Sequence, residues 1–130
     1  METLDNIRLS VRARNQLSTL KRKTGVPQWN TLCRWAFCLS LSEPTAPREL
    51  QRGEAGVELA WRTFAGEWES IYVAALKERC HQDGAVIDRA TLNNAVRMHI
   101  TRGIGYLASR VNSIEDICTL AQQPDTRSQI

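Results

Sequence analysis

Lysine and arginine side chains are concentrated in the first third of the sequence, where the chemistry they offer is anion binding. No acidic residue occurs between Asn6 and Ser42, and this stretch carries seven cations: Arg8, Arg12, Arg14, Lys21, Arg22, Lys23 and Arg34. The chain of 130 residues has a formal net charge of only +3, so its positive charge is segregated. A phosphate polyanion is the usual partner of such a block, which predicts nucleic-acid binding. The alternative is a solvated face that pairs with acidic residues of a neighbouring subunit.

Three consecutive cations, Lys21, Arg22 and Lys23, precede Thr24 and Gly25. This glycine stands where a helix favours a left-handed residue, and the cations complement the negative end of the helix dipole. Cationic side chains and exposed amides at such a corner suit phosphate groups. Trp29 could stack on an exposed base there, although a tryptophan buried in the core is the simpler interpretation.

Residue patterns typical of catalysis are scarce. Gly103-Ile104-Gly105 lacks the third glycine and the preceding strand of a dinucleotide loop. His99 falls on an apolar helix face, which favours a hydrogen-bonded core histidine over a catalytic base. A group of glutamates is interpreted as a solvated face or a docking site for a basic partner: Glu54, Glu58, Glu67 and Glu69. We therefore expect no enzymatic activity and no catalytic residue.

The four cysteines, Cys33, Cys38, Cys80 and Cys118, contain no CxxC pair. We interpret them as free thiols that fill the core as small apolar residues, and we expect neither a metal nor a cofactor. The sequence shows no apolar run long enough to cross a membrane and no signal peptide, so a cytoplasmic protein without membrane contact is expected.

Hydrophobic periodicity predicts the elements that position the cations. Apolar residues alternate with Arg8, Ser10 and Arg12, which predicts a strand over 7–12 with these three on its polar face. A helical pattern follows over 13–23. A second helix over 27–41 is apolar on all sides, which places it in the centre of the fold or in a subunit interface. Residues 42–56 form the longest predicted loop.

The second half is predicted to be helical. Residues 57–61 are compatible with a strand or a helix start. A helix over 68–83 has its apolar side at Trp68, Ile71, Tyr72, Ala75, Leu76 and Arg79, and a helix over 88–111 buries Leu92, Val96, His99, Gly103, Tyr106, Leu107 and Val111. A short helix over 113–121 precedes a disordered tail, 122–130. The predicted fold is one mainly α domain, 1–121, with a short N-terminal strand followed by about five helices.

A basic strand followed by two helices resembles the start of a ribbon-helix-helix module. Such modules pair their strands across a dimer and lay the resulting ribbon on DNA. A sequence-specific transcriptional regulator of this type is therefore one of the open functional alternatives.

Longer strings of the sequence resemble the DndE family of bacterial DNA phosphorothioation systems. They are IRLSVRA (7–13), LKRKTGVPQWNTLCRWAFCLSLSEP (20–44), LKERCHQDG (76–84) and MHITRGIGYLASRVNSIEDI (98–117). Their order and spacing extend the resemblance from Asn6 to Ile117.

The resemblance implies a function. In these systems a cysteine desulfurase supplies sulfur, and other Dnd proteins exchange it for a non-bridging phosphate oxygen of DNA. DndE-like proteins are the non-catalytic, DNA-binding component; they form homo-oligomers, tetramers in the family picture, and favour nicked duplex. The family's basic turn falls here on Lys21, Arg22 and Lys23. The remaining alternative is a scaffold that holds the other Dnd proteins together.

Overall fold

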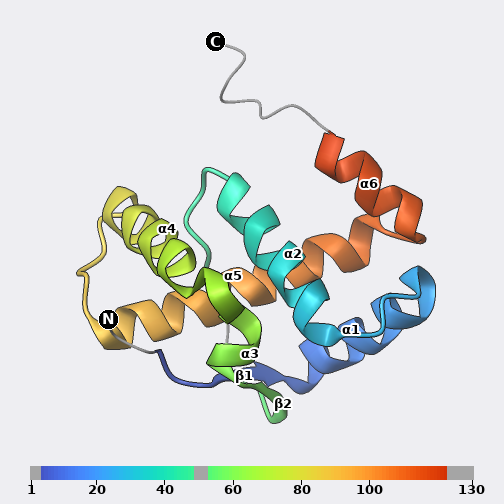
Figure 1. Cartoon of the computed structure of the whole chain (residues 1–130), viewed down its shortest axis with the longest axis horizontal. Coiled ribbons are helices and arrows are strands. Elements are labelled where there is room, and N and C mark those ends of the chain that lie inside the picture. Colours follow the sequence, from blue (N-terminus) through green and yellow to red (C-terminus); the bar gives the residue numbers. More distant parts are fainter. Residues whose placement is uncertain (1–3, 49–52, 123–130) are drawn as a thin grey trace.

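The computed structural model describes residues 4–48 and 53–122, and these are mostly helical (Figure 1). The elements follow one another as β1 (Ile7–Ser10), α1 (Val11–Thr24), α2 (Trp29–Ser42), β2 (Ala55–Leu59), α3 (Trp61–Ala65), a 3₁₀ turn (Gly66–Trp68), α4 (Glu69–Gln82), α5 (Arg89–Arg110) and α6 (Ile114–Gln122). The expected mainly α fold with a short N-terminal strand is therefore confirmed. The predicted tail falls almost entirely outside the described residues, and Gln122 is the last residue of α6.

The N-terminal strand pairs within its own chain. β1 runs antiparallel to β2, with Ile7 opposite Leu59 and Leu9 opposite Val57. The open question about residues 57–61 is thus resolved, because β2 ends at Leu59 and α3 begins at Trp61. A ribbon-helix-helix module would instead pair this strand with a second subunit. The resemblance to that module is limited to the order of the elements.

The strand is also shorter than predicted. Ser10 caps α1, and its Oγ accepts a hydrogen bond of 3.1 Å from the amide of Ala13. A serine in this role ends the extended segment and begins the helix. Arg12 consequently lies in the first turn of α1, and its predicted place on the polar face of the strand beside Arg8 is wrong.

α2 is the central helix and packs across α5 (Figure 1). Gly103 makes the crossing possible, since a Cβ at this position would lie 1.8 Å from the carbonyl oxygen of Ala36. The helix begins at Trp29 and not at Pro27, and it buries Leu32, Cys33, Ala36, Phe37 and Ser40. Its expected central position is confirmed, whereas a role in a subunit interface stays a prediction.

Aromatic rings fill the space between α2, α3 and α4. The Phe37 ring lies edge-on to the rings of Phe64 and Tyr72, with 5.7 Å between centroids in each pair. Phe64 stacks on Tyr72 at 5.6 Å, and Trp61 lies 5.8 Å from Phe64. The short helix α3 is held in place by these contacts, because five residues form too few backbone hydrogen bonds to be stable alone.

The predicted apolar face of α4 is partly wrong. Trp68 and Ile71 are 54% and 57% exposed, while Val73, Leu76, Arg79 and Cys80 are the residues that α4 buries. Leu76 and Arg79 are buried as predicted, and the buried Arg79 is a hydrogen-bond donor. Its Nη1 donates to the carbonyl of Leu41 at 2.9 Å and its Nη2 to that of Glu43 at 2.6 Å.

A second arginine completes this arrangement from α5. Arg102 Nη2 donates to the carbonyl of Ser40 at 2.8 Å, and its Nη1 donates to the carbonyl of Thr45 at 2.8 Å. Arg79 Nη2 also donates to the Thr45 carbonyl. We call these two side chains the arginine clamp. The clamp supplies donors to carbonyl groups at the C-terminal end of α2 and in the segment that follows it.

His99 is a core histidine, as expected. Its Nδ1 lies 2.8 Å from Ser40 Oγ, and that oxygen accepts a hydrogen bond of 2.8 Å from Arg102 Nε. Ser40 thus links the imidazole of His99 to the guanidinium of Arg102. Burial, followed by the nearby cations Arg102 and Arg79, lowers the pKa of His99 to about 4.

Candidate nucleic-acid interface

The solvent face of α1 carries five exposed cations, which we call the α1 basic face: Arg12, Arg14, Lys21, Arg22 and Lys23. The opposite side of the same helix buries Ala13, Leu17 and Leu20 in the core. No carboxylate of the described residues forms an ion pair with any of the five. The cations therefore belong to one element, and they extend over a helix about 20 Å long instead of occupying a single corner.

The basic turn at the end of α1 is held firmly. Gly25 has a φ of 74° and donates its amide to the Lys21 carbonyl at 2.9 Å, as the sequence predicts for a left-handed cap. The hydroxyl of Thr24 donates to the Leu20 carbonyl at 2.7 Å and accepts from the Val26 amide at 3.2 Å. These bonds fix the backbone that presents the three cations.

One cation of the basic turn contacts the segment that follows α5. Lys23 Nζ donates to Asn112 Oδ1 at 3.3 Å, and Asn112 follows the end of α5. Arg110, exposed in the last turn of α5, lies with its guanidinium 4.8 Å from the centre of the Tyr106 ring. The C-terminal ends of α1 and α5 thus present cations near one another.

Two other predicted site residues lie elsewhere. Arg8, on β1, donates its Nε to Glu58 Oε1 at 3.1 Å, and both side chains are exposed. Arg34, on α2, donates to the carbonyls of Phe64 at 2.8 Å and Thr63 at 2.9 Å. Arg34 therefore caps the end of α3, and we leave it out of the α1 basic face.

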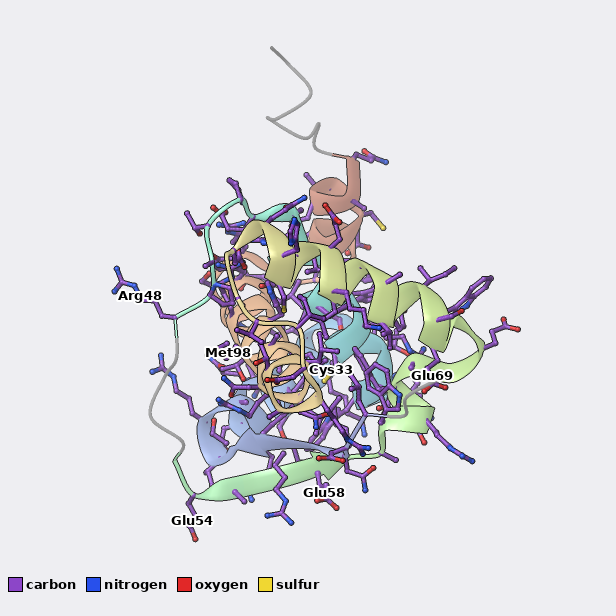
Figure 2. The ribbon with its side chains drawn as sticks, turned by 90° about the vertical axis from the view of Figure 1, so that its left-hand side faces the viewer. Cys33, Arg48, Glu54, Glu58, Glu69 and Met98 are labelled. Atoms are coloured by element: carbon purple, nitrogen blue, oxygen red, sulfur yellow. The ribbon has the colours of Figure 1, made fainter. Side chains whose placement is uncertain are left out.

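Three of the four glutamates, Glu54, Glu58 and Glu67, are exposed, whereas Glu69 is engaged in the fold. Glu54 precedes β2 and Glu58 lies on it, and both project from the edge of the molecule (Figure 2). Glu69 is half-buried and accepts a hydrogen bond of 2.9 Å from Trp61 Nε1. Glu69 is therefore not part of such a face, and the interpretation of the other three as a solvated face or a docking site stays a prediction.

Trp29 is half-buried against the core at the start of α2. Its Nε1 and the Oδ1 of the neighbouring Asn30 are inaccessible to solvent and have no hydrogen-bond partner among the described residues. Both follow the basic turn closely in the sequence. The tryptophan is thus neither a fully buried core residue nor a fully exposed platform.

The cysteines divide into two pairs. Cys33 and Cys80 are buried as expected, whereas Cys38 and Cys118 are exposed, so the prediction of buried thiols is wrong for these two. Burial raises the pKa of Cys33 to about 12, although the Arg34 cation acts in the opposite direction. A thiol with such a pKa is not a nucleophile at neutral pH. No group of three His, Cys, Asp or Glu side chains that could hold a metal ion occurs in residues 4–48 and 53–122.

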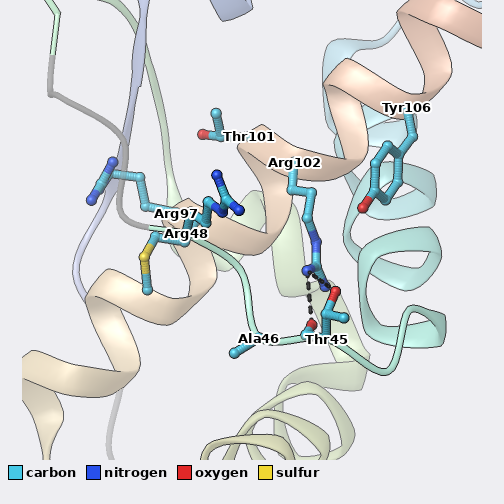
Figure 3. Close-up of a pocket in the computed structure, with 8 residues that line it drawn as sticks. Thr45, Ala46, Arg48, Arg97, Thr101, Arg102 and Tyr106 are labelled. Atoms are coloured by element: carbon cyan, nitrogen blue, oxygen red, sulfur yellow. Dashed lines mark hydrogen bonds between the residues drawn. The ribbon is translucent and has the colours of Figure 1, made fainter. Parts of the chain in front are cut away.

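The structure also gathers cations that sequence patterns did not bring together. Arg48, from the segment after α2, lies beside Arg97 and Arg102 of α5 around a pocket of about 370 Å³ (Figure 3). Five residues separate Arg97 from Arg102, which is about 140° around α5, so helical periodicity does not bring them together, and the sequence gives no indication that residue 48 returns to this helix.

The fold and this surface define a small, mainly helical protein that displays a basic helix beside a two-stranded sheet. The DndE protein of Escherichia coli B7A, whose crystal structure is described as that of a protein involved in DNA phosphorothioation modification, is similar in fold. The TM-score is 0.67 at 24% sequence identity, and the match covers 82% of this chain and 99% of that one. No curated protein sequence matches this chain.

Residues 6–115 match the family described as DNA sulphur modification protein DndE, and the chain belongs to this family. The resemblance inferred from the strings between Asn6 and Ile117 is thereby confirmed. No helix of the described segments is long and apolar enough to cross a membrane.

Proposed function

We propose that this protein is the non-catalytic, DNA-binding subunit of a bacterial DNA phosphorothioation system and that it acts on duplex DNA in the cytoplasm. Membership of the DndE family supports the part of the proposal that assigns the protein to a DNA sulphur modification system. The observation that carries the binding role is the α1 basic face, with five exposed cations and no ion pair to a described carboxylate. Arg8 is a weaker candidate for the same surface because Glu58 already neutralises it.

The chemistry of this face is phosphate recognition. Lysine and arginine on the outside of a helix reach backbone phosphates, and such contacts carry little sequence information. β1 also pairs with β2 of its own chain, whereas a sequence-reading regulator of the ribbon-helix-helix type pairs this strand with that of a second subunit. We therefore favour sequence-independent binding over a transcriptional regulator.

The state of two candidate reactive groups, His99 and Cys33, supports the non-catalytic part of the proposal. His99 is buried, and its pKa of about 4 keeps it neutral. The Cys33 thiol, with a pKa of about 12, stays protonated. Neither group reaches solvent, so neither can take a proton from a bound substrate or attack it.

We also propose that nicked duplex is a ligand and that the protein is a homo-oligomer, a tetramer in the arrangement the family resemblance implies. Trp29 is partly accessible near the basic turn and can stack on a base that a nick exposes. The exposed side chains of Trp68 and Ile71 supply an apolar contact that one chain leaves uncovered.

The same two apolar side chains favour a second candidate function, a scaffold for the other Dnd proteins. In that case Trp68 and Ile71 contact a different protein, and the α1 basic face meets an acidic protein surface. Both candidates place the protein in a complex with other Dnd proteins, and they differ in whether DNA is bound directly.

A salt titration of DNA binding separates the two candidates. The purified full chain is titrated with intact, nicked and single-stranded DNA of one sequence at several salt concentrations. Direct phosphate contacts give an affinity that falls steeply with salt, by about 0.9 in log–log slope for each duplex phosphate neutralised. A scaffold gives no saturable DNA binding at low salt, and a regulator gives tight binding to one sequence only.

A further inference from the structure

A shallow groove opens to solvent between α1 and α5, and we call it the α1–α5 groove. α1 supplies five of its lining residues and α5 supplies one: Val11, Arg12, Asn15, Gln16, Thr19 and Ala108. None of the six is acidic, and the α5 side contributes only the methyl group of Ala108. The chemistry of the groove is therefore set by the polar side chains of α1.

Most of these polar side chains have no partner. Those of Arg12, Gln16 and Thr19 form no hydrogen bond and no ion pair with any described residue. Asn15 Oδ1 accepts one long hydrogen bond of 3.5 Å, from Arg14 Nη2. Since Gln16 and Thr19 follow Arg12 by four and seven residues, the three side chains form one row along the helix. Their donors are free to bind a ligand in the groove.

Lys23 continues this row towards the end of α1. It follows Arg12 by eleven residues, which is three turns of helix and only about 20° around its axis. Its Nζ donates to Asn112 Oδ1 at 3.3 Å, and Asn112 comes four residues after Ala108, just beyond the end of α5. The amide of Asn112 is itself fixed by a hydrogen bond of 2.8 Å to Asp116 Oδ2. Because the asparagine side chain is neutral, it orients the ammonium group of Lys23 without cancelling its charge.

Two other cations of the α1 basic face lie on a different side of the helix. Arg14 and Lys21 are about 200° and 180° around the axis from Arg12. A ligand in the α1–α5 groove reaches the row from Arg12 to Lys23 and not these two. The α1 basic face thus has a groove side and an outer side, with one arginine and one lysine on each.

The spacing of the groove-side cations favours an extended polyanion over a small anion. Arg12 and Lys23 are about 16 Å apart along the helix axis, and Lys23 is held at Asn112. The two cations therefore contact different anionic groups. Glutamine and threonine side chains between them are common hydrogen-bond donors to the phosphate oxygens of DNA. A row of donors with a cation near each end and no carboxylate in its lining complements the backbone of one DNA strand.

We propose that the DNA backbone binds along the α1–α5 groove and that the outer side of the α1 basic face contributes little. Arg12 and Lys23 contact separate phosphates of one strand of the duplex, and Gln16 and Thr19 donate to phosphate oxygens between them. Asn112 is a positioning residue that directs Lys23 to its phosphate. This inference rests on the proposed DNA-binding function and names the part of the basic face that carries it.

Two double variants of equal charge test the inference. Arg12→Ser with Lys23→Ser removes the groove-side cations, and Arg14→Ser with Lys21→Ser removes the outer ones; all four side chains are exposed. Fluorescence anisotropy with one labelled duplex at several salt concentrations measures affinity and salt slope. The groove-side variant is expected to reduce the log–log slope by about 1.8, which corresponds to two phosphate contacts. The outer variant is expected to retain most of the slope.

A neutral pair of variants tests the groove without changing the charge. Ala108→Leu fills the groove and is expected to weaken duplex binding about fivefold or more, because hydrogen bonds to the backbone are lost. The matched control, Ser109→Leu, adds the same side chain at the neighbouring exposed position and should leave binding unchanged. Thermal unfolding of each variant verifies that it is folded.

The outcomes separate the inference from the function on which it rests. Absence of salt-dependent duplex binding by the natural sequence would overturn both. If the natural protein binds duplex DNA but the two double variants lose equal slope, the groove assignment alone is wrong. Binding by folded Ala108→Leu protein that equals binding by Ser109→Leu protein would also overturn the groove assignment and leave the DNA-binding function in place.

Discussion

His99 is the residue whose ionisation is most strongly tied to the fold. Its ring shares a hydrogen bond with Ser40, it is buried, and two arginines lie close enough to oppose a positive charge on it. The folded-state pKa of about 4 is below the ordinary value of 6.5, so the unfolded chain binds a proton at a higher pH than the folded chain does. The stabilisation is complete above pH 6.5 and is lost as the pH falls towards 4.

We expect the free energy of unfolding to decrease by about 3 kcal/mol over this range as a result of His99. Urea unfolding at pH 7, 5.5 and 4.5 measures the decrease. The His99→Gln variant should be less stable at pH 7 but should show a flatter pH dependence, whereas His81→Gln, at an exposed position, should retain the dependence of the natural sequence. Equal pH dependence in all three proteins would contradict the assignment.

The buried and exposed cysteines provide a second residue-scale comparison. Cys33 is 0% exposed, and serine there would place a hydroxyl group in the core without a partner. We expect Cys33→Ser to lower the free energy of unfolding by about 2 kcal/mol and to leave DNA binding intact while the protein is folded.

The exposed Cys38 on the same helix is the matched control, and Cys38→Ser should change stability by less than about 0.5 kcal/mol. Urea unfolding at one pH measures both variants. A loss of DNA binding by folded Cys33→Ser protein would show that the thiol has a functional role.

At the scale of elements, two glycines of α5 allow the effect of helix packing on stability to be measured separately from the effect of helix propensity. A Cβ at Gly103 would overlap the backbone of Ala36, while a Cβ at Gly105 would meet nothing within 4 Å. Gly103→Ala must push α2 away from α5, and we expect it to destabilise the protein by about 3 kcal/mol. Gly105→Ala should stabilise it by up to about 1 kcal/mol, because alanine favours the helix and fits the open space. Thermal unfolding of both variants measures the difference, and a destabilised Gly105→Ala protein would contradict it.

The elements also show what the sequence predicts and what it does not. The buried residues of α5 follow a clear helical period, so Leu92, Val96, His99 and Leu107 are predicted correctly. On α4 the period is partly misleading: Leu76 and Arg79 are buried as it predicts, but Trp68 and Ile71 are exposed. The carbonyl groups that bind Arg79 lie at and after the end of α2, and no local pattern in α4 reveals them.

The candidate site likewise has a part that the sequence predicts and a part that it does not. Lys21, Arg22 and Lys23 are adjacent in the sequence, and the cap at Gly25 is a local signal, so the basic turn is predictable. The meeting of Arg48 with Arg97 depends on the path of the segment after α2, and the partners of Arg34 lie on α3. Contacts between residues far apart in the chain require the fold.

At the scale of the whole molecule, the α1 basic face predicts how the affinity for DNA depends on the salt concentration. Replacement of Lys21, Arg22 and Lys23 by alanine should weaken binding to every duplex sequence alike and reduce the log–log salt slope by about two to three units for each participating subunit. Filter binding or fluorescence anisotropy at several salt concentrations measures both effects.

The matched control for this triple variant is Arg62→Ala with Lys77→Ala, which removes two exposed cations from α3 and α4. The control should leave the slope unchanged. If the triple variant folds normally and keeps its affinity and slope, DNA contacts lie elsewhere and the scaffold becomes the better proposal.

The assembly is the second prediction at this scale. Trp68→Asp places a charge on the exposed apolar pair formed with Ile71, and it should shift the protein towards the monomer. Light scattering measures the mass. Trp35→Asp tests the interface predicted for α2; because Trp35 is half-buried against the core, its thermal stability must be measured beside the mass. Retention of the native mass by both folded variants would exclude these surfaces from the interface.

The crossing of α2 and α5 also constrains the order in which the chain can fold during its synthesis. α2 carries much of the apolar surface, and its main partner spans Arg89–Arg110, so most of the chain must leave the ribosome before the two helices can meet. β1 likewise waits for β2, about fifty residues later. Until then α2 exposes a hydrophobic surface, and a nascent chain of this protein is expected to bind chaperones until α5 emerges.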